Sequence, residues 1–174
     1  MRFLGAFFIL TIVAAAAGTA VAQKASPSTA PPTISLTISA VHDSVKAGSP
    51  VVIDVTLLNK SSHDIVFRRE IRGRDLHVDV RDVNGKLAAD TKLGYIWNGH
   101  VANLDVTRVS PQDLSLNTVI VTVKAGETLP WELDAGRLYD LSQPGKYSIQ
   151  VQRQDPENPA LIVKSNTITV TATP

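Results

Sequence analysis

Hydrophobic and polar residues alternate with a period of two along most of this chain. Between residues 33 and 40, for example, isoleucine, leucine and alanine alternate with serine and threonine, and this pattern is typical of a strand with one buried face. The runs that share the pattern are 33–40, 51–57, 65–67, 76–80, 119–123, 129–133, 147–151 and 168–172. We therefore expect about eight β-strands, and the chain shows no convincing helical period.

Short polar segments rich in glycine or proline separate these runs. Residues 46–50 (KAGSP) and 124–127 (KAGE) are of this kind, and residues 155–159 (DPENP) are expected to form a long hairpin loop. The dipeptide Asn84-Gly85 accepts positive φ at both positions of a two-residue hairpin. Many short strands joined by such turns predict an all-β fold, an antiparallel sandwich of two sheets with about 7–9 strands.

Two segments depart from the alternating pattern. Residues 88–116 are the least regular. They are long for a connector, so they hold either weak strands around Val101, Leu104 and Val106 or a functional loop. Residues 138–141 (LYDL) are expected to form at most one short turn of helix.

The first 22 residues form a pattern of their own. Arg2 precedes an almost wholly apolar run from Phe3 to Ala17, and Ala20-Val21-Ala22 places small residues at the positions that a signal peptidase reads. The run is too short to span a membrane and no stop-transfer charges follow it, which is typical of a secretory signal peptide. We therefore expect residues 1–22 to be removed after Ala22, with the mature chain secreted or periplasmic and without a membrane span.

The length of the mature chain fits one domain. Removing residues 1–22 from the 174 leaves 152, which suits a flexible spacer rich in proline, serine and alanine at 23–32 and one sandwich domain at 33–173.

The net charge narrows the classes of partner. The 174 residues include 17 basic and 16 acidic ones, and the leader contains one of the arginines, so the mature chain has no net charge. Nucleic acid is therefore not an expected partner.

The chain contains no cysteine. This composition excludes disulfides, thiol catalysis and cysteine-based metal sites. An exported domain without disulfides depends on its core alone for stability, and such domains are commoner among bacterial proteins, so we expect a bacterial origin.

Two segments resemble parts of bacterial immunoglobulin-like domains. Residues 141–151 (LSQPGKYSIQV) match the Pro-Gly-x-Tyr entry to the penultimate strand of such domains, and AGE and WEL precede them within 125–133. Residues 51–61 (VVIDVTLLNKS) resemble the second strand with its following Asn-x-Ser. The resemblance implies an immunoglobulin-like sandwich in which Tyr147 hydrogen-bonds the nearby backbone and Ile149 replaces the sheet-bridging cysteine.

The strands are also similar to those of bacterial proteinase-inhibitor domains of the intracellular Bacillus type. No inhibitory residue carries over from that family.

The main candidate site lies in residues 93–100 (LGYIWNGH), where Tyr95, Trp97, Asn98 and His100 gather between glycines. Aromatic side chains on a loop over a rigid sandwich make protein or sugar contacts. The alternative is that Tyr95 and Trp97 fold inward and cap one end of a core that has few large side chains.

A second candidate site is a group of arginines around Gly73, with Glu70 and Asp75 among them. Such a group would form an anion site for a phosphate, a carboxylate or an acidic glycan. The alternative is a solvated, internally compensated sheet edge that discourages aggregation. The four are Arg68, Arg69, Arg72 and Arg74.

No metal site and no cofactor are expected. None of the four histidines forms a recognised ligand pair. His77 and Asp79 share one strand face, about 6–7 Å apart, but that face is expected to be solvated. Residues 82–86 (DVNGK) lack the further carboxylates of a calcium loop.

A catalytic constellation is likewise not expected. The chain has no Gly-x-Ser-x-Gly elbow. Asp134 with Asp140, or Glu127 with Glu132, would be the carboxylate pairs for glycoside cleavage, yet their places in turns and on an outer face predict surface solvation. A dispersed Ser-His-Asp site remains an alternative.

The sequence therefore predicts an exported, non-catalytic domain that binds a protein partner or a cell-envelope component through Tyr95–His100, assisted by residues 68–74. Three alternatives stay open. The first is a proteinase inhibitor that inserts residues 88–116 or 153–160 into a protease cleft. The second is a hydrolase with a dispersed site, and the third is a purely structural accessory domain.

Overall fold

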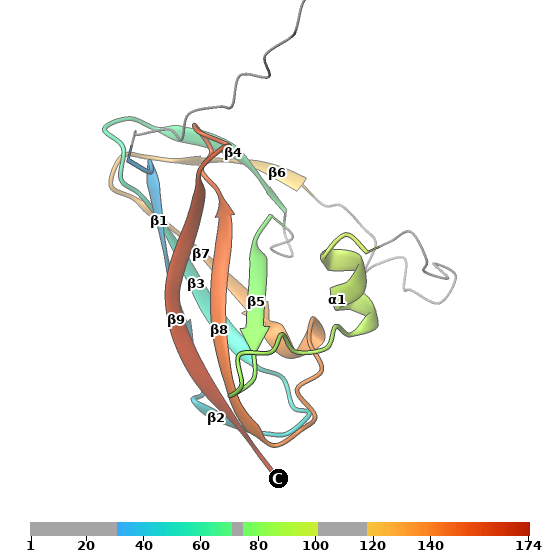
Figure 1. The fold of residues 1–174 in the computed structure, drawn as a ribbon. Coiled ribbons are helices and arrows are strands. Elements are labelled where there is room, and N and C mark those ends of the chain that lie inside the picture. The colour runs from blue at the N-terminus through green and yellow to red at the C-terminus, as the bar shows by residue number, and fades with distance from the viewer. Residues whose placement is uncertain (1–30, 71–74, 101–117) are drawn as a thin grey trace, which may run out of the picture.

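The computed structural model describes residues 31–70, 75–100 and 118–174 (Figure 1). The predicted signal peptide, residues 23–30 of the predicted spacer, Arg72, Arg74 and the predicted weak strands at 101–106 lie outside the described residues. The elements in chain order are β1 (Ile34–Ala40), β2 (Ser44–Lys46), β3 (Val52–Asn59), β4 (Ile65–Glu70), β5 (His77–Arg81), α1 (Lys92–Trp97), β6 (Thr118–Val123), β7 (Thr128–Asp134), the 3₁₀ turn η3 (Ala135–Arg137), β8 (Gly145–Gln154) and β9 (Ile162–Thr173).

Two sheets face each other across one core (Figure 1). Their strand orders are β1-β3-β7 and β2-β9-β8-β5. These orders correspond to the two sheets of an immunoglobulin sandwich, in which the first, second and fifth strands oppose the third, sixth and seventh. The predicted all-β, immunoglobulin-like sandwich is therefore confirmed, with one departure: the short strand β2 pairs with β9 in parallel.

The core is built from the inward positions of the alternating strands. On β5, Leu76 just before the strand and Val78 and Val80 within it are at most 1% exposed, and Trp131 of β7 is 4% exposed. Burying one such side chain contributes about 1.5–3 kcal/mol. The predicted period of two therefore gives both the strands and the direction in which each side chain points.

A separate two-stranded sheet, β4–β6, lies at one end of the sandwich (Figure 1). The fully buried Asn59 holds the corner at which β3 ends and this ribbon begins. Its Nδ2 donates to the carbonyl oxygens of His63 at 2.8 Å and Val123 at 2.9 Å, and its Oδ1 accepts from the amide of Ser61 at 2.9 Å. A buried amide with these partners carries little desolvation cost.

The irregular stretch that we expected after residue 88 contains a short helix, α1. Thr91 explains it, because its Oγ1 accepts a hydrogen bond from the amide of Gly94 at 3.0 Å and so satisfies one of the free donors of the first turn. The helical turn expected at 138–141 does not form there; the 3₁₀ turn η3 precedes that segment and ends at Arg137. No helix within the described ranges has the length and apolar character needed to cross a bilayer.

The hairpin at Asn84-Gly85 differs in detail from the expected two-residue turn. Only Gly85 has positive φ, at 77°. The Oδ1 of Asp82 accepts from the amides of Asn84 at 2.9 Å and Lys86 at 3.0 Å. This carboxylate closes a wider turn, in which a single left-handed residue is enough.

Tyr147 occupies the corner that the resemblance implied. Its hydroxyl donates to the carbonyl oxygen of Gln143 at 2.9 Å, which fixes the entry to β8. This sequence-based expectation is confirmed.

Candidate functional site

The outer edge of β5 is closed by hydrogen-bond donors that come from outside the sheet. β5 is the last strand of its sheet in the described part of the chain, and its strand partner is β8. Carbonyl groups at three alternate positions along its other edge each accept a hydrogen bond. The pairs are Trp97 Nε1 to Leu76 O at 3.2 Å, Tyr139 Oη to Val78 O at 2.5 Å and Ala88 N to Val80 O at 2.8 Å. Burial raises the pKa of Tyr139, so its phenol stays protonated and remains a donor.

Three contacts hold α1 beside this edge. The amide of Thr91 donates to the carbonyl oxygen of Leu138 at 2.9 Å. Gly94 rests directly on the backbone of Leu138, because a Cβ at that position would come within 1.8 Å of the same carbonyl oxygen. At the other end of the helix, Nδ2 of Asn98 donates at 3.3 Å to Oη of Tyr139, the hydroxyl that itself donates to β5. The helix is therefore fixed at both ends.

The four predicted binding residues lie on α1 and in the turn that follows it. Asn98 is the C-cap of the helix and serves the fold. Tyr95 is half-buried, and its ring lies 5.0 Å from the ring of the exposed His100. Trp97 is half-buried and packs against the core. Trp97 thus packs partly inward, as the alternative expectation from the sequence stated, and its ring also borders a groove.

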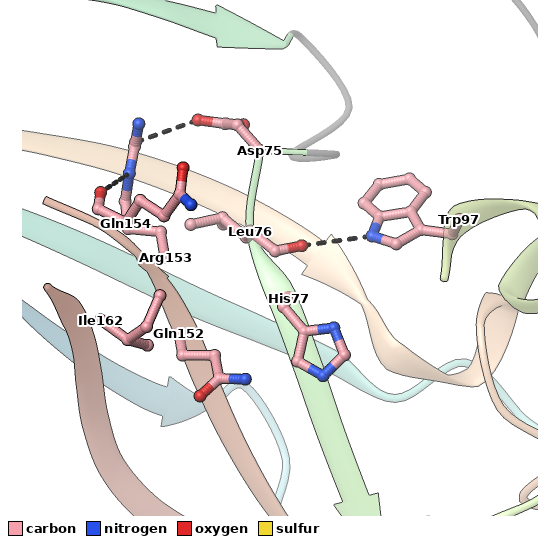
Figure 2. A pocket seen from close by; sticks show the side chains of 8 residues that line it. All are labelled: Asp75, Leu76, His77, Trp97, Gln152, Arg153, Gln154 and Ile162. Carbon is pink, nitrogen blue, oxygen red and sulfur yellow. Dashed lines mark hydrogen bonds and ion pairs between the residues drawn. The ribbon is translucent and has the colours of Figure 1, made fainter. Parts of the chain in front are cut away.

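This groove has a volume of about 370 Å³ and lies at the N-terminal end of β5 (Figure 2). His77 of β5 and Gln152 of β8 lie directly opposite each other in the sheet. Neither side chain has a hydrogen-bond partner within the described residues, so both are available to a ligand. The lining residues are Asp75, Leu76, His77, Trp97, Gln152, Arg153, Gln154 and Ile162.

A buried ion pair closes one end of the groove. Nη1 of Arg153 lies 3.0 Å from Oδ2 of Asp75, with side-chain exposures of 8% and 14% (Figure 2). The guanidinium carbon is 4.5 Å from the centroid of the Phe67 ring. Burial lowers the pKa of Arg153, and the neighbouring Asp75 and Asp155 oppose that effect. The pair therefore fixes this end of the groove and is itself already compensated.

The groove continues onto the polar outer face of the sheet. The strand register places side chains of β5, β8 and β9 in two rows across this face. A second hollow of about 240 Å³ lies beside the groove and is lined by Asp79, Arg81, Ser148, Gln150, Lys164 and Thr167. The rows are His77–Gln152–Lys164 and Asp79–Gln150–Thr167.

The glutamines of this face were not among the site residues predicted from the sequence. Gln150, Gln152 and Gln154 recur at every second position of β8, and all three point away from the core. The signal is present in the sequence as QVQRQ. It was hidden because the predicted strand ended at residue 151, before the inward-facing Arg153.

The structure does not bring the predicted arginine group together in the part that it describes. Arg68 is exposed, whereas the next residue, Arg69, points to the opposite face of β4. Nη2 of Arg69 donates to the carbonyl oxygen of Pro130 at 3.1 Å, and its guanidinium carbon lies 4.8 Å from the centroid of the Trp131 ring. Arg69 therefore covers the edge of β7.

Three of the aspartates weighed for metal binding or catalysis, Asp79, Asp134 and Asp140, have local partners. Asp79 forms a two-point pair with Arg81, at 2.7 Å and 2.8 Å. Asp134 accepts from the amides of Val51 and Gly136, both at 2.9 Å. Asp140 accepts from the amide of Ser142 at 3.0 Å. Within the described ranges, no group of three or more histidine, aspartate or glutamate residues is arranged to hold a metal ion.

Comparisons with known proteins give distant structural similarity and no family. No family model matches the sequence, and no curated protein matches it. Solved structures that resemble it include a CARDB domain from Pyrococcus furiosus, crystallised with di-metal ions, at TM-score 0.39 and 13% identity over 82% of this chain and 89% of that one. Another is a PapD-like domain of human CEP192, at TM-score 0.33 and 14% identity over 90% and 96%.

A β-glucosidase from Listeria innocua in complex with glucose matches at TM-score 0.40 and 16% identity. The match covers 82% of this chain and only 16% of the enzyme. All these TM-scores lie below 0.5, so the architecture rests on the strand order given above.

Proposed function

We propose that this protein is an exported, non-catalytic binding domain that holds a protein partner or a cell-envelope component in the groove between α1 and β5. One observation carries the proposal: the bond from Trp97 to Leu76 fixes the indole ring beside His77 and Gln152. A ligand site needs such groups, which are held rigidly by the scaffold and are not consumed by it.

Export is proposed from the leader sequence. The pattern of residues 1–22 predicts a mature chain that starts at Gln23. Sequencing the N-terminus of the protein recovered from the periplasm or the medium tests this directly. A chain that retains Met1 in the cytoplasm would contradict it.

Retention of an envelope component tests the binding site. Immobilised residues 23–174 are incubated with the solubilised cell envelope and the culture fluid of the source organism, beside the variant His77→Ala/Gln152→Ala. Both side chains face outward, so the variant is expected to fold, which circular dichroism checks. We expect a component that the wild type retains and the variant loses.

A matched control is Gln143→Ala, which removes an exposed glutamine from the turn before β8. This variant should retain the component as well as the wild type does. Equal retention by all three proteins would move the binding surface away from the groove. Retention of nothing by the wild type would contradict the proposed function.

Proteinase inhibition is the second candidate function, and the turn between β8 and β9 favours it. The carboxylate of Asp155 accepts from the amides of Glu157 at 3.0 Å and Asn158 at 3.1 Å, which gives the exposed residues beyond it a rigid base. Inhibitory loops need such rigidity to keep their affinity. Dose-dependent inhibition in a protease panel, abolished by changes at 156–160, would support this candidate.

A further inference from the structure

We infer that the ligand of this surface is a saccharide chain, which lies across the outer face of β5, β8 and β9 from the Trp97 groove to the hollow beside Gln150. The inference rests on the proposed function and adds the chemical class of the ligand. Four properties of the face carry it: its side-chain chemistry, its free hydrogen-bonding groups, its charge and its shape.

The first property is the side-chain chemistry of β8. A glutamine side chain presents a donor and an acceptor in one planar group. The hydroxyl groups of a sugar are also both donors and acceptors, so neighbouring hydroxyls can pair with one amide at two points. Gln150, Gln152 and Gln154 place three such amides along one line, with about 6.8 Å from each to the next along the strand.

The second property is that several of these groups have no other role. Gln152, Gln154 and His77 make no side-chain hydrogen bond within the described residues. Gln150 uses only its Nε2, which donates to the carbonyl oxygen of Ser165 at 3.1 Å, so its Oε1 can still accept. A surface whose polar groups are not already paired gains hydrogen bonds when a polar ligand binds.

The third property is a polar and nearly neutral character. Asp79 and Arg81 compensate each other at 2.7 Å, which leaves Lys164 as the cation of these rows. A nucleic-acid surface needs a strong positive field, and the centre of a protein interface is depleted in charge and rich in large apolar groups. The large apolar side chains that the groove presents are Ile162, at 47% exposure, and the half-buried Trp97. The face therefore suits a neutral, polyhydroxylated ligand better than either macromolecule.

The fourth property is the shape of the surface. The hollows of about 370 Å³ and 240 Å³ lie on adjacent rows of the same sheet face and are both open. Trp97 lines the larger hollow (Figure 2), and an indole ring offers an apolar surface against which the apolar face of a sugar ring can lie. Two open hollows on adjacent rows of one face can hold a chain of sugar units, whereas a single small molecule is usually bound in an enclosed pocket.

Titration with neutral hexasaccharides tests the inference. Chitohexaose, maltohexaose and mannohexaose are each titrated into residues 23–174 while the backbone amides of the isotope-labelled protein are followed by NMR. We expect at least one of them to bind and to shift the amides of 77–79, 97 and 150–154. The variant His77→Ala/Gln152→Ala should weaken that binding by about tenfold or more, because it removes two hydrogen-bonding groups.

The control variant Gln143→Ala should bind the same hexasaccharide as the wild type does. Failure of all three saccharides to bind, or shifts confined to other surfaces, would overturn the inference. The outcome is distinguishable from failure of the proposed function: a protein that retains a proteinaceous envelope component through the groove, but binds no hexasaccharide, keeps the site and refutes the saccharide.

Discussion

The indole Nε1 of Trp97 lies 3.2 Å from the carbonyl oxygen of Leu76. This bond pairs the carbonyl group at the N-terminal end of the β5 edge and, at the same time, sets the orientation of the ring that borders the groove. An open strand edge with unpaired carbonyl groups is a template for pairing with another chain. The same residue therefore protects the fold from association and shapes the candidate site.

Replacing Trp97 with phenylalanine keeps an aromatic ring but removes the indole N–H, so it tests the hydrogen bond itself. Trp97→Phe leaves the carbonyl of Leu76 without its donor, so we expect the free energy of unfolding to fall by about 1–3 kcal/mol and self-association to increase. Urea denaturation and light scattering measure the two effects. The control Tyr95→Phe removes a hydroxyl that makes no hydrogen bond within the described residues, and it should change neither. A Trp97→Phe protein as stable and as monomeric as the wild type would show that the edge does not depend on this bond.

Gly94 should tolerate no side chain. A Cβ there would lie 1.8 Å from the carbonyl oxygen of Leu138, so Gly94→Ala must move α1 away from the sandwich, although alanine favours helix. We expect faster hydrogen exchange of the amides of 95–98 in this variant. Gly145→Ala is the control, because a Cβ at Gly145 meets nothing within 4 Å. Unchanged protection of α1 in Gly94→Ala would mean that the helix is not held against Leu138.

Asp155 should make the fold sensitive to acid. Burial raises the pKa of this carboxyl, but hydrogen bonds from Thr33, Glu157 and Asn158 outweigh that effect and hold the pKa below its usual value. A lowered pKa in the folded state stabilises the protein above the unfolded value of about 3.9, and this contribution is lost as the pH falls through the folded pKa.

The variant Asp155→Asn should therefore be less stable than the wild type at pH 7, and the difference should shrink below about pH 4. Thermal melts from pH 7 to pH 2 measure this. Asp54→Asn, at an exposed position of β3, is the matched control and should follow the wild-type curve. A constant difference between Asp155→Asn and the wild type at all pH values would contradict the role assigned to the ionised carboxylate.

The pair Arg153–Asp75 should be costly to break from one side. Asp75→Ala leaves a guanidinium of 8% exposure without its carboxylate, and breaking a buried pair in this way costs about 3–5 kcal/mol. The double variant Asp75→Ala/Arg153→Met removes both charges and keeps an apolar chain over Phe67, so it should recover part of the loss. Urea denaturation of the wild type and the two variants measures the loss and the part that is recovered. A double variant less stable than Asp75→Ala would contradict this account.

The sandwich could be predicted from the sequence because its strands each bury one face. Residues 76–80 show why: alternation alone identifies the inward residues Leu76, Val78 and Val80. The helix α1 could not be predicted in the same way. It has six residues, so hydrophobic period gives no signal over that length, and what holds it is the long-range contact between Gly94 and Leu138.

The candidate site was predicted only in part for a related reason. The sequence indicated Trp97 because other aromatic residues lie near it in the chain, but the neighbours that complete the groove come from strands distant in sequence. His77 and Gln152 are 75 positions apart in the numbering and become neighbours only through the pairing of β5 with β8. Strand register is set by the whole sheet, and an isolated segment does not reveal it.

The most direct measurement uses the two tryptophans of the chain. Their indole N–H signals are recorded by NMR while residues 23–174 are titrated with the solubilised cell envelope. Trp97 borders the groove, whereas Trp131 is 4% exposed in the core and serves as an internal control. We expect the Trp97 signal to shift or broaden while the Trp131 signal stays unchanged. Binding of an envelope component that leaves the Trp97 signal unmoved would contradict the assignment of the groove as the binding site.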